Sequence, residues 1–351
     1  MENKLKTLVI LTPGFPANEA DSIFTPPQQI FVKALKDAYP SLNIIVLTFQ
    51  YPAISKIYWW HGVKVISFGS PGNGRIHGLY TGLRVWLTLR RLNKKHHIIG
   101  LLSFWLGKCA FIGHNFAKKH HLKHYTWILG QDAKAGNKYV TRIKPAGESL
   151  IALSDFIVDE FSRNYNITPQ HIIPVGIDTA LFGNAPTVKD IDILGAGSLK
   201  PLKQYTIFLE VIAALKPRYP NIKVVIAGGG PQMKQLQQMI EALNIENQVT
   251  LPGWLDHDNI LATMQRTKIF LHPSSYEGFG AVCLEALYAG AKVISFVKPM
   301  KAIIPNWYIA ADRTEMLEMT QQLLADKNLN HQRVLPYIIQ DNAKAMMQLF
   351  E

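Results

Sequence analysis

The stretch HPSSYEGFGAVCLEALYAG, residues 272–290, places Glu277 in a glycine-rich turn and Glu285 on the apolar run that follows. A carboxylate beside apolar residues must be paired, hydrated or used in chemistry. The first amides of the predicted helix, with its positive dipole end, favour an anion. The amides that would bind this anion are those around Gly280, Ala281 and Val282, and Gly278 and Gly280 would let the backbone approach the ligand closely. We therefore expect a phosphorylated ligand whose hydroxyl groups are bound by both glutamates; alternatively, Glu277 caps the helix and Glu285 forms an ion pair in the core.

A second glycine-rich turn, GAGSLKPLKQY at residues 195–205, follows another predicted strand. Gly197 and Ser198 lie in the turn. Lys203 lies near the start of the next helix, where an ammonium group would neutralise a diphosphate. Taken alone, Lys203 would more often be a solvated surface residue. The turn lacks the G-x-G-x-x-G spacing, so the dinucleotide fingerprint of dehydrogenases is missing.

Two segments of the first half also follow predicted strands. The loop at residues 11–29 contains Gly14, and loops of this length in compact domains are usually functional; the alternative is a plain connector. The segment WILGQDAKAGNKY, residues 127–139, places Asp132 where it would either face a ligand or cap a short helix.

Two D-x-D triplets have the spacing that can hold a nucleotide-bound divalent metal, Asp190 with Asp192 and Asp256 with Asp258. The first begins a predicted strand and the second occupies a predicted helix N-cap, so we expect structural roles and no metal. Six histidines between residues 96 and 124 lack a recognised ligand spacing and are predicted to be surface groups. They are residues 96, 97, 114, 120, 121 and 124.

Strand-like and helix-like segments alternate along the chain, which is typical of βαβ units and parallel sheets. The expected strands, with the turns that follow some of them, are residues 7–12, 43–49, 63–68, 97–104, 124–129, 190–199, 222–231, 249–253, 268–274 and 291–297. The expected helices are residues 26–39, 82–95, 205–220, 233–244, 258–267 and 334–351. We predict an α/β chain of two Rossmann-like domains facing each other across a cleft. Their predicted ranges are 1–182 and 183–330, joined by a linker at 181–189 and followed by a terminal helical segment at 331–351.

The composition is that of a globular protein long enough for two domains, with 351 residues, 48% hydrophobic and 18% charged. The two cysteines suit a reducing cytosol. We expect neither a signal peptide nor a spanning helix, which needs roughly 18–20 uncharged apolar residues. Residues 1–182 hold 21 Lys and Arg against 10 Asp and Glu, whereas residues 183–351 hold 16 against 15. The basic first half therefore points to an anionic partner: a membrane, a nucleic acid or an acidic polymer.

Glu277 and Glu285, with seven residues between them, resemble the E-x7-E signature of retaining glycosyltransferases of the GT-B fold, specifically glycosyltransferase family four. The resemblance extends in order over most of the chain, through the loop with Gly14 and the stretches IPVGIDTALF (173–182), GSLKPLK (197–203) and IAGGGP (226–231). It implies that the second domain binds a UDP- or GDP-sugar donor without a metal or other cofactor. The first domain would bind a glycan or lipid-linked acceptor, and the terminal helix would cross back onto this domain.

The same resemblance implies roles for the candidate residues. Glu285 would bind the ribose hydroxyls and Glu277 those of the transferred sugar, while Lys203 and the amides near Gly280 would hold the diphosphate and stabilise its developing charge. The implied catalytic residues are Glu277, Lys203 and Asp132. The implied donor-binding residues are Glu285, Gly280, Ala281, Val282, Phe279, Gly278, Ser198, Gly197 and Gly14.

The chain departs from the family pattern at Ser198, where arginine is common, and at Leu129, where histidine is frequent. The leading interpretation is a retaining, metal-independent hexosyltransferase of cell-surface polysaccharide or glycolipid synthesis. The alternative is a sugar-nucleotide-binding protein without transfer activity.

The helix at 82–95, with Trp86 and several basic residues, would rest on an anionic bilayer or present a merely solvated face. We expect a cytoplasmic protein, peripheral on the inner face of the membrane. Nucleic-acid binding, a third interpretation, has no aromatic-and-basic motif to support it, and no nucleic-acid partner is expected.

Overall fold

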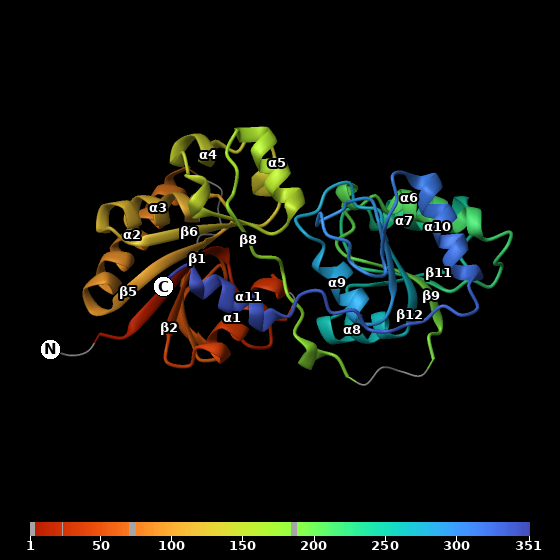
Figure 1. The fold of residues 1–351 in the computed structure, drawn as a ribbon, viewed down its shortest axis with the longest axis horizontal. Helices are drawn as coiled ribbons and strands as arrows, with labels where there is room; N and C mark the ends of the chain where they lie inside the picture. The colour runs from red at the N-terminus through yellow and green to blue at the C-terminus, as the bar shows by residue number, and fades with distance from the viewer. Residues whose placement is uncertain (1–3, 23, 70–74, 184–187) are drawn as a thin grey trace. The chain divides into compact units, whose positions relative to one another are not determined.

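The computed structural model describes residues 4–22, 24–69, 75–183 and 188–351, which form two compact units (Figure 1). Unit 1 is Met1–Gly176 with Ile339–Glu351, and unit 2 is Ile177–Ile338. The division falls before the predicted boundary at residue 182 because Ile177 already pairs with Ile338 and donates its amide to the Tyr337 carbonyl at 2.9 Å. Residues 184–187 of the predicted linker lie outside the described residues.

Unit 1 is built on an eight-stranded sheet with the order β3-β4-β2-β1-β5-β6-β7-β8, in which β3 alone is antiparallel to its neighbour. The strands are β1 (Lys6–Gly14), β2 (Asn43–Tyr51), β3 (Ser55–Trp60), β4 (Val63–Phe68), β5 (His97–Phe104), β6 (Lys123–Ile128), β7 (Leu150–Ala152) and β8 (His171–Ile172). Residues Leu8 to Leu11 of β1 are fully buried, since a central parallel strand is covered on both faces.

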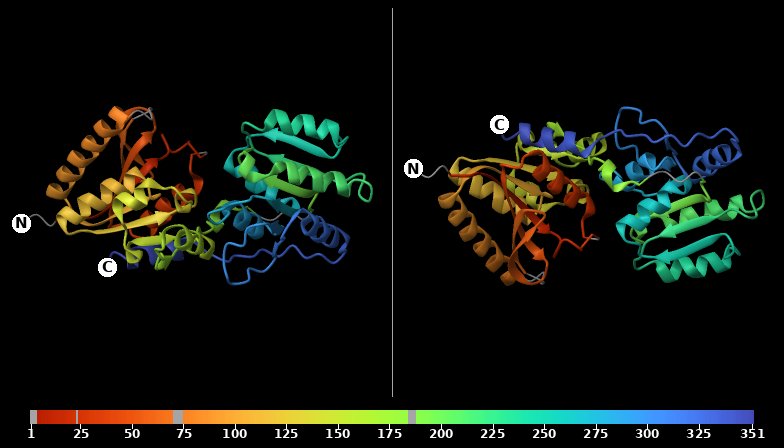
Figure 2. Two further views of the ribbon diagram at one scale, coloured as in Figure 1. Left: turned by 90° about the horizontal axis from the view of Figure 1, so that it is seen from above. Right: turned by 90° about the horizontal axis from the view of Figure 1, so that it is seen from below.

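The helices of unit 1 cover both faces of this sheet, with α2 and α11 on opposite sides (Figure 2). They are α1 (Pro26–Ala38), α2 (Arg75–Lys95), α3 (Lys108–His120), α4 (Lys138–Ile143), α5 (Asp155–Tyr165) and α11 (Ile339–Gln348). The apolar face of α2 packs with α3 on β1, β2 and β5. Helix α11 begins at Ile339 rather than at residue 334, because Pro336 disfavours helix and Ile338 pairs with Ile177.

Unit 2 is built on a six-stranded parallel sheet with the order β11-β10-β9-β12-β13-β14. The strands are β9 (Ile191–Ala196), β10 (Val224–Ala227), β11 (Val249–Gly253), β12 (Thr267–His272), β13 (Lys292–Ser295) and β14 (Trp307–Ile309). The helices are α6 (Tyr205–Leu215), α7 (Met233–Ala242), α8 (His257–Gln265), α9 (Ala281–Tyr288) and α10 (Arg313–Ala325). Helix α6 ends five residues before the predicted limit because Pro217 has no amide to continue the helix.

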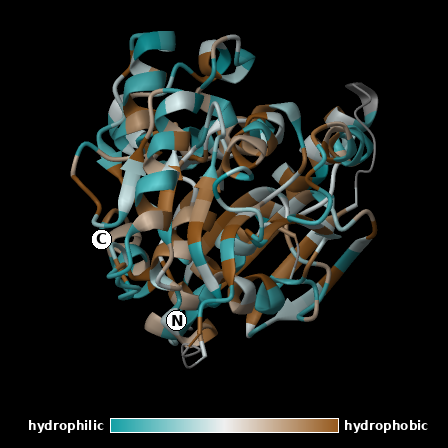
Figure 3. Cartoon of the chain, turned by 90° about the vertical axis from the view of Figure 1, so that its right-hand side faces the viewer, coloured by the Kyte–Doolittle hydropathy of each residue, from teal (hydrophilic) through white to brown (hydrophobic). Residues whose placement is uncertain are grey.

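The strands are the most uniformly hydrophobic elements, while the helices alternate hydrophobic and hydrophilic residues (Figure 3). This distribution is expected where helices cover both faces of a parallel sheet. The predicted α/β fold with two Rossmann-like domains is confirmed, whereas the predicted cleft between them stays a prediction. No helix among the described residues is both long and apolar enough to cross a bilayer.

Candidate functional site

The strand order of unit 2 places its candidate site at one position of the sheet. Strand β9 has β10 and β11 on one side and β12, β13 and β14 on the other, so the order reverses between β9 and β12. The loops after these two parallel strands leave toward opposite faces and form a crevice at their carboxyl ends, where ligands bind in such sheets. Both predicted loops start here, since GSLKPLK follows β9 and HPSSYEGFG follows β12.

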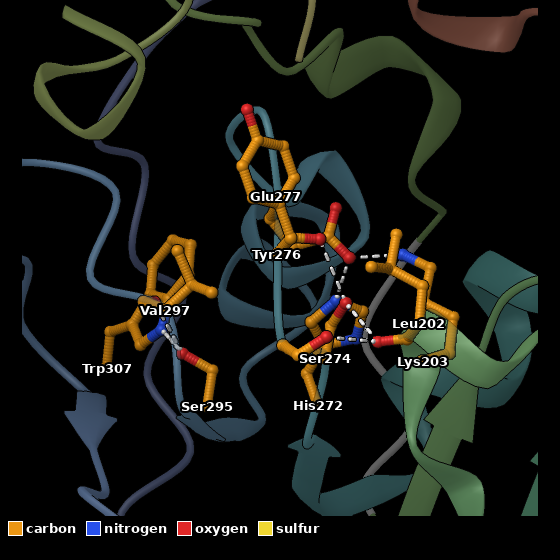
Figure 4. Close-up of polar contacts among 10 residues, drawn as sticks. Leu202, Lys203, His272, Ser274, Tyr276, Glu277, Ser295, Val297 and Trp307 are labelled. Atoms are coloured by element: carbon orange, nitrogen blue, oxygen red, sulfur yellow. Dashed lines mark hydrogen bonds and ion pairs between the residues drawn. The ribbon is translucent and has the colours of Figure 1, made fainter. Parts of the chain in front are cut away.

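Hydrogen bonds join these two loops (Figure 4). The Leu202 carbonyl accepts from the Ser275 amide at 3.0 Å and from Ser274 Oγ at 3.2 Å. Leu202 belongs to a 3-10 turn, η4 (Pro201–Lys203), so these bonds fix the direction in which the Lys203 side chain leaves its loop.

The central cluster of the site is formed by Lys203, His272 and Glu277 (Figure 4). Glu277 Oε1 accepts from His272 Nε2 at 2.8 Å and from Lys203 Nζ. Glu277 and Lys203 are mostly buried, with side-chain exposures of 15% and 18%. Lys203 is therefore not the solvated lysine of the alternative interpretation, and residues 74 positions apart in sequence meet at the predicted site.

The cluster also sets the charge of its members. Burial opposes ionisation of Glu277, but its contacts with His272 and Lys203 hold the pKa of this carboxyl well below its usual range. Burial lowers the pKa of His272, although Glu277 works against that shift. At neutral pH we therefore assign a carboxylate to Glu277 and a neutral imidazole to His272. The amino group of Lys203 has three N–H donors and keeps two beyond its bond to Glu277.

The backbone element for which anion binding is predicted is the N-terminus of α9. The N-cap residue is Gly280, with φ 88°, and no side chain caps the helix. Glu277 is thus not the cap, so the capping part of the alternative is wrong, whereas Glu285 does form a mostly buried pair, with His257. The amides of Ala281 and Val282 begin the helix, where no intrahelical acceptor exists for them.

Two further glycines allow the turns after β9 and β10 to lie against each other. Gly197 has φ 145° and Gly228 has φ 149°, backbone angles that residues with a side chain rarely adopt. A Cβ on Gly228 would lie 1.8 Å from the Gly197 carbonyl oxygen. Close backbone packing therefore positions the loop that contains Ser198 and Lys203.

Phe279 anchors the second loop instead of exposing its ring. It is buried and packs edge-on against Trp307 and Tyr337, with ring centroids 6.1 and 5.6 Å away. Trp307 Nε1 donates to Ser295 Oγ at 2.8 Å, as Figure 4 shows. The ring of Phe279 is thus held in the core of unit 2, and contact between this residue and a ligand stays a prediction.

Glu285 has a partner that the sequence did not reveal. Its Oε1 accepts from His257 Nε2 at 2.8 Å, and both side chains are mostly buried. His257 is the middle residue of the second D-x-D triplet, and helix packing of α8 against α9 brings it to Glu285. Spacing within the sequence gave no signal for this contact.

Both D-x-D triplets have structural roles, as predicted. Asp190 pairs with Arg266, and Asp192 pairs with Lys268 Nζ at 2.7 Å. Asp256 caps α8 by accepting from the Asn259 amide at 2.8 Å.

The candidate residues of unit 1 lie at the carboxyl ends of β1 and β6. Asp132 is buried, and its carboxylate accepts from the amides of Leu106 at 2.7 Å, Gly130 at 2.9 Å and Leu129 at 3.1 Å. Burial raises the pKa of this carboxyl to about 6, although the amide hydrogen bonds work against that shift. Asp132 does not cap a helix, because no side chain caps the 3-10 turn to which it belongs, η1 (Gln131–Ala133); its carboxylate instead joins the segments after β5 and β6. Its catalytic role stays a prediction.

Gly14 ends β1 beneath an aromatic pair. A Cβ there would lie 2.5 Å from the Phe24 ring, which stacks on Tyr51 with centroids 4.2 Å apart. Its contact with a ligand stays a prediction. Among the first-half histidines, His124 is not a surface group: its Nε2 lies 2.9 Å from Ser103 Oγ, and burial lowers its pKa to about 3.

Comparisons with known proteins show which families and structures this chain resembles. Residues 177–332 match the model of the family described as Glycosyl transferases group 1. The chain is 29% identical over 103 residues to 2-deoxystreptamine N-acetyl-D-glucosaminyltransferase of Niallia circulans, covering 29% of this chain and 26% of that protein. It is 38% identical over 93 residues to the phosphatidylinositol N-acetylglucosaminyltransferase gpi3 subunit of Schizosaccharomyces pombe, covering 26% and 20%.

The matched segments thus span about a quarter or less of these two curated relatives. The fold is also similar to the crystal structure of Anabaena HepE in complex with UDP and glucose. That likeness has a TM-score of 0.67 and 16% identity, and it covers 97% of this chain and 94% of the other. Residues 177–332, almost the whole of unit 2, match the group 1 glycosyl transferases, so this unit of the chain is similar to that family.

Proposed function

We propose that the protein is a retaining, metal-independent hexosyltransferase that uses a UDP- or GDP-sugar as donor. The observation that carries this proposal is the cluster of Lys203, His272 and Glu277 at the reversal point of the unit 2 sheet. It lies within the family-matching residues and beside the N-terminus of α9. The HepE structure contains UDP and glucose, which supports the same ligand class here.

The reaction breaks the bond between the sugar C1 and the diphosphate oxygen and forms a bond from C1 to an acceptor hydroxyl, whose proton is released. Negative charge grows on the leaving diphosphate, and stabilising that charge is the largest task of such a site. Lys203 Nζ and the first amides of α9 supply donors for it. Glu277, kept ionised, accepts hydrogen bonds from sugar hydroxyls, and Glu285 accepts them from ribose.

The acceptor is proposed only as a chemical class. We infer a glycan or lipid-linked acceptor in cell-surface polysaccharide or glycolipid synthesis at the cytoplasmic face of a membrane. The phosphatidylinositol-directed relative supports a lipid-linked acceptor.

A donor screen tests the proposal. Purified protein is incubated with UDP- and GDP-hexoses, with and without a chelator, and released nucleoside diphosphate is measured with the anomer first formed. We expect one donor class to be cleaved with retention, unaffected by the chelator, and Lys203→Met to lose most of this turnover. Inversion would contradict the mechanism, and chelator sensitivity would contradict metal independence.

The alternative function is sugar-nucleotide binding without transfer. Ser198, which supplies no cation, and Leu129, whose amide bonds Asp132, favour it. Stabilisation of the protein by UDP or GDP without turnover of any donor, across a panel of acceptors, would establish this alternative.

The anionic partner predicted from charge fits one surface of unit 1, which we name the α2–β3 surface. Leu79, Leu83 and Leu87 recur every fourth residue on α2 and are exposed, Leu79 to 77%. On β3, Ile57 and Trp59 are also exposed.

These two elements share one face of the sheet. Arg84 of α2 donates from NH2 to Ser55 Oγ at 2.7 Å, so the side of β3 that carries Ser55 faces α2. Ile57 and Trp59 point to that same side because strand residues alternate. The exposed apolar side chains of both elements therefore form one surface.

Charge indicates what covers this surface. The sequence contains no Asp or Glu between Asp37 and Asp132, so both elements are free of acidic residues. Basic residues Arg84, Arg90, Arg91, Lys94 and Lys95 accompany the leucines on α2. Apolar side chains beside clustered cations are typical of binding to anionic lipid headgroups.

Vesicle sedimentation tests this part of the proposal. We expect binding to phosphatidylglycerol vesicles but not to phosphatidylcholine vesicles, weakening with salt. Leu79→Ser with Leu83→Ser should reduce it at least about tenfold, since burying one leucine contributes about 1.5–3 kcal/mol. Ile303→Ser, at a position of unit 2 exposed to 88%, is the matched control. Binding to RNA or DNA stronger than to anionic vesicles would contradict the membrane assignment.

A further inference from the structure

The pair formed by His257 and Glu285 has no role in the chemistry described so far. His257 is the first residue of α8, and its Nε2 donates to Glu285 Oε1 at 2.8 Å. Asp256 fixes the start of this helix by capping the Asn259 amide at 2.8 Å. The exposures of the two side chains are 15% and 14%, so the contact is enclosed by the fold and is not a solvent-exposed pair.

The pair matters because of the charge of a nucleoside diphosphate. An ionised carboxylate without a partner would repel the phosphates of such a ligand, the more strongly in a partly buried site. Lys203 neutralises the carboxylate of Glu277, and His257 is the corresponding basic partner of Glu285. Each glutamate of the E-x7-E pattern is thus matched with one basic side chain from a different element.

The surroundings of His257 favour its protonated form. Burial lowers the pKa of His257, but the hydrogen bond and charge of Glu285, with the charges of Asp258 and Asp256, outweigh burial and raise it above its usual value. Glu285 faces it from α9, and the two aspartates face it from its own segment. A charge-assisted hydrogen bond is stronger and better oriented than a neutral one.

We propose that His257 is a positioning residue for the nucleotide: it holds Oε1 of Glu285 and neutralises the carboxylate, leaving Oε2 to accept from the ribose hydroxyls. The inference rests on the proposed function, because it assumes a ribose at Glu285. It adds that nucleotide affinity depends on the protonation of a residue outside the family pattern. Specificity for a ribonucleotide follows from the orientation of the Glu285 carboxylate and is lost when His257 no longer holds that orientation.

Calorimetry of UDP and GDP binding at pH 6, 7 and 8 tests the inference. We expect His257→Ala to raise the Kd about tenfold at pH 6, as for loss of a hydrogen bond to a charged group. His257→Gln, whose amide can still donate, should lose less affinity. The ratio of variant to wild-type Kd should shrink as the pH rises through the raised pKa of His257. Titration of the nucleotide's own phosphate changes the Kd of both proteins by the same factor, so it does not affect this ratio.

Two controls separate positioning from folding. His331→Gln removes another partly buried histidine of unit 2, bonded to the Gly290 carbonyl at 3.0 Å, and should leave the Kd unchanged. In ligand-free protein, the pKa of His257 measured by NMR should fall in Glu285→Gln.

The outcomes that overturn the inference are distinct. Equal Kd values for wild type, His257→Ala and His257→Gln, or a His257 pKa that does not respond to Glu285→Gln, overturn it alone. Failure of the wild-type protein to bind either nucleoside diphosphate overturns the donor assignment and the inference with it.

Discussion

Replacing Lys203 by methionine tests whether one ion pair holds the two site loops of unit 2 together. Lys203 lies in the loop after β9, and Glu277 lies in the loop after β12. Methionine keeps the length and the apolar stem of the side chain but removes the ammonium. The variant therefore leaves the Glu277 carboxylate with His272 as its remaining hydrogen-bond donor.

The magnitude follows from burial. Removing one partner of a fully buried ion pair costs about 3–5 kcal/mol. The exposures of Lys203 and Glu277, 18% and 15%, together with the remaining bond from His272, reduce this to roughly 2 kcal/mol. Glu277→Gln keeps an acceptor and should cost about 1 kcal/mol. In the double variant no buried charge remains unpaired, so its loss should fall short of the sum by about 1 kcal/mol.

Amide hydrogen exchange of β9 and β12 measures these free energies locally, which matters because a chain of two units need not unfold in one step. The pKa of Glu277 is depressed in the folded state, so its stabilisation is complete above the ordinary glutamate pKa and declines as the pH falls through the folded value. The coupling should thus be full at pH 7. Additivity within about 0.3 kcal/mol at pH 7 would refute the reasoning.

Three further predictions concern stability. Gly228→Ala should lower the free energy of unfolding of unit 2 by more than about 3 kcal/mol, since its Cβ would meet the Gly197 carbonyl. Gly253→Ala, which has open space around its Cβ, should cost only about 1–2 kcal/mol of backbone strain. Equal losses in denaturant titrations of the two variants would contradict this. The pKa of Asp132 is raised to about 6, so its contribution to the stability of unit 1 should be present near pH 4 and be lost as the pH rises through 6. Hydrogen exchange of unit 1 should show this loss of stability in the wild type but not in Asp132→Asn. Tyr205 Oη is buried without a hydrogen-bond partner among the described residues, so Tyr205→Phe should leave the melting temperature unchanged or raise it, and a clear fall would show a missed partner.

Much of the candidate site of unit 2 could be predicted from local patterns. A strand followed by a glycine turn and a helix places the turn at the carboxyl edge of a parallel sheet, so Lys203 and Glu277 could be assigned to the same edge from sequence. Their direct contact depends on β9 and β12 being neighbours, and that follows from strand order, which no local pattern specifies. The prediction therefore identified the residues but not the ion pair.

Other features required tertiary structure. His257 reaches Glu285 through the packing of α8 on α9, which the D-x-D spacing could not reveal. Strand β3 was missed because SKIYWW is an edge strand with both polar and aromatic residues exposed. Asp132 could be placed after β6, but only the loop after β5 supplies the Leu106 amide that it binds.

The central claim is that unit 2 binds a nucleoside diphosphate between the loops after β9 and β12, with Glu285 on the ribose. Titration calorimetry of UDP and GDP against the wild-type protein and Glu285→Ala tests it most directly. We predict that one of the two nucleotides binds the wild type and that Glu285→Ala weakens this binding at least about tenfold, as expected for losing a charged acceptor. Binding that is equally tight in Glu285→Ala, or no binding of either nucleotide to the wild type, would contradict the claim.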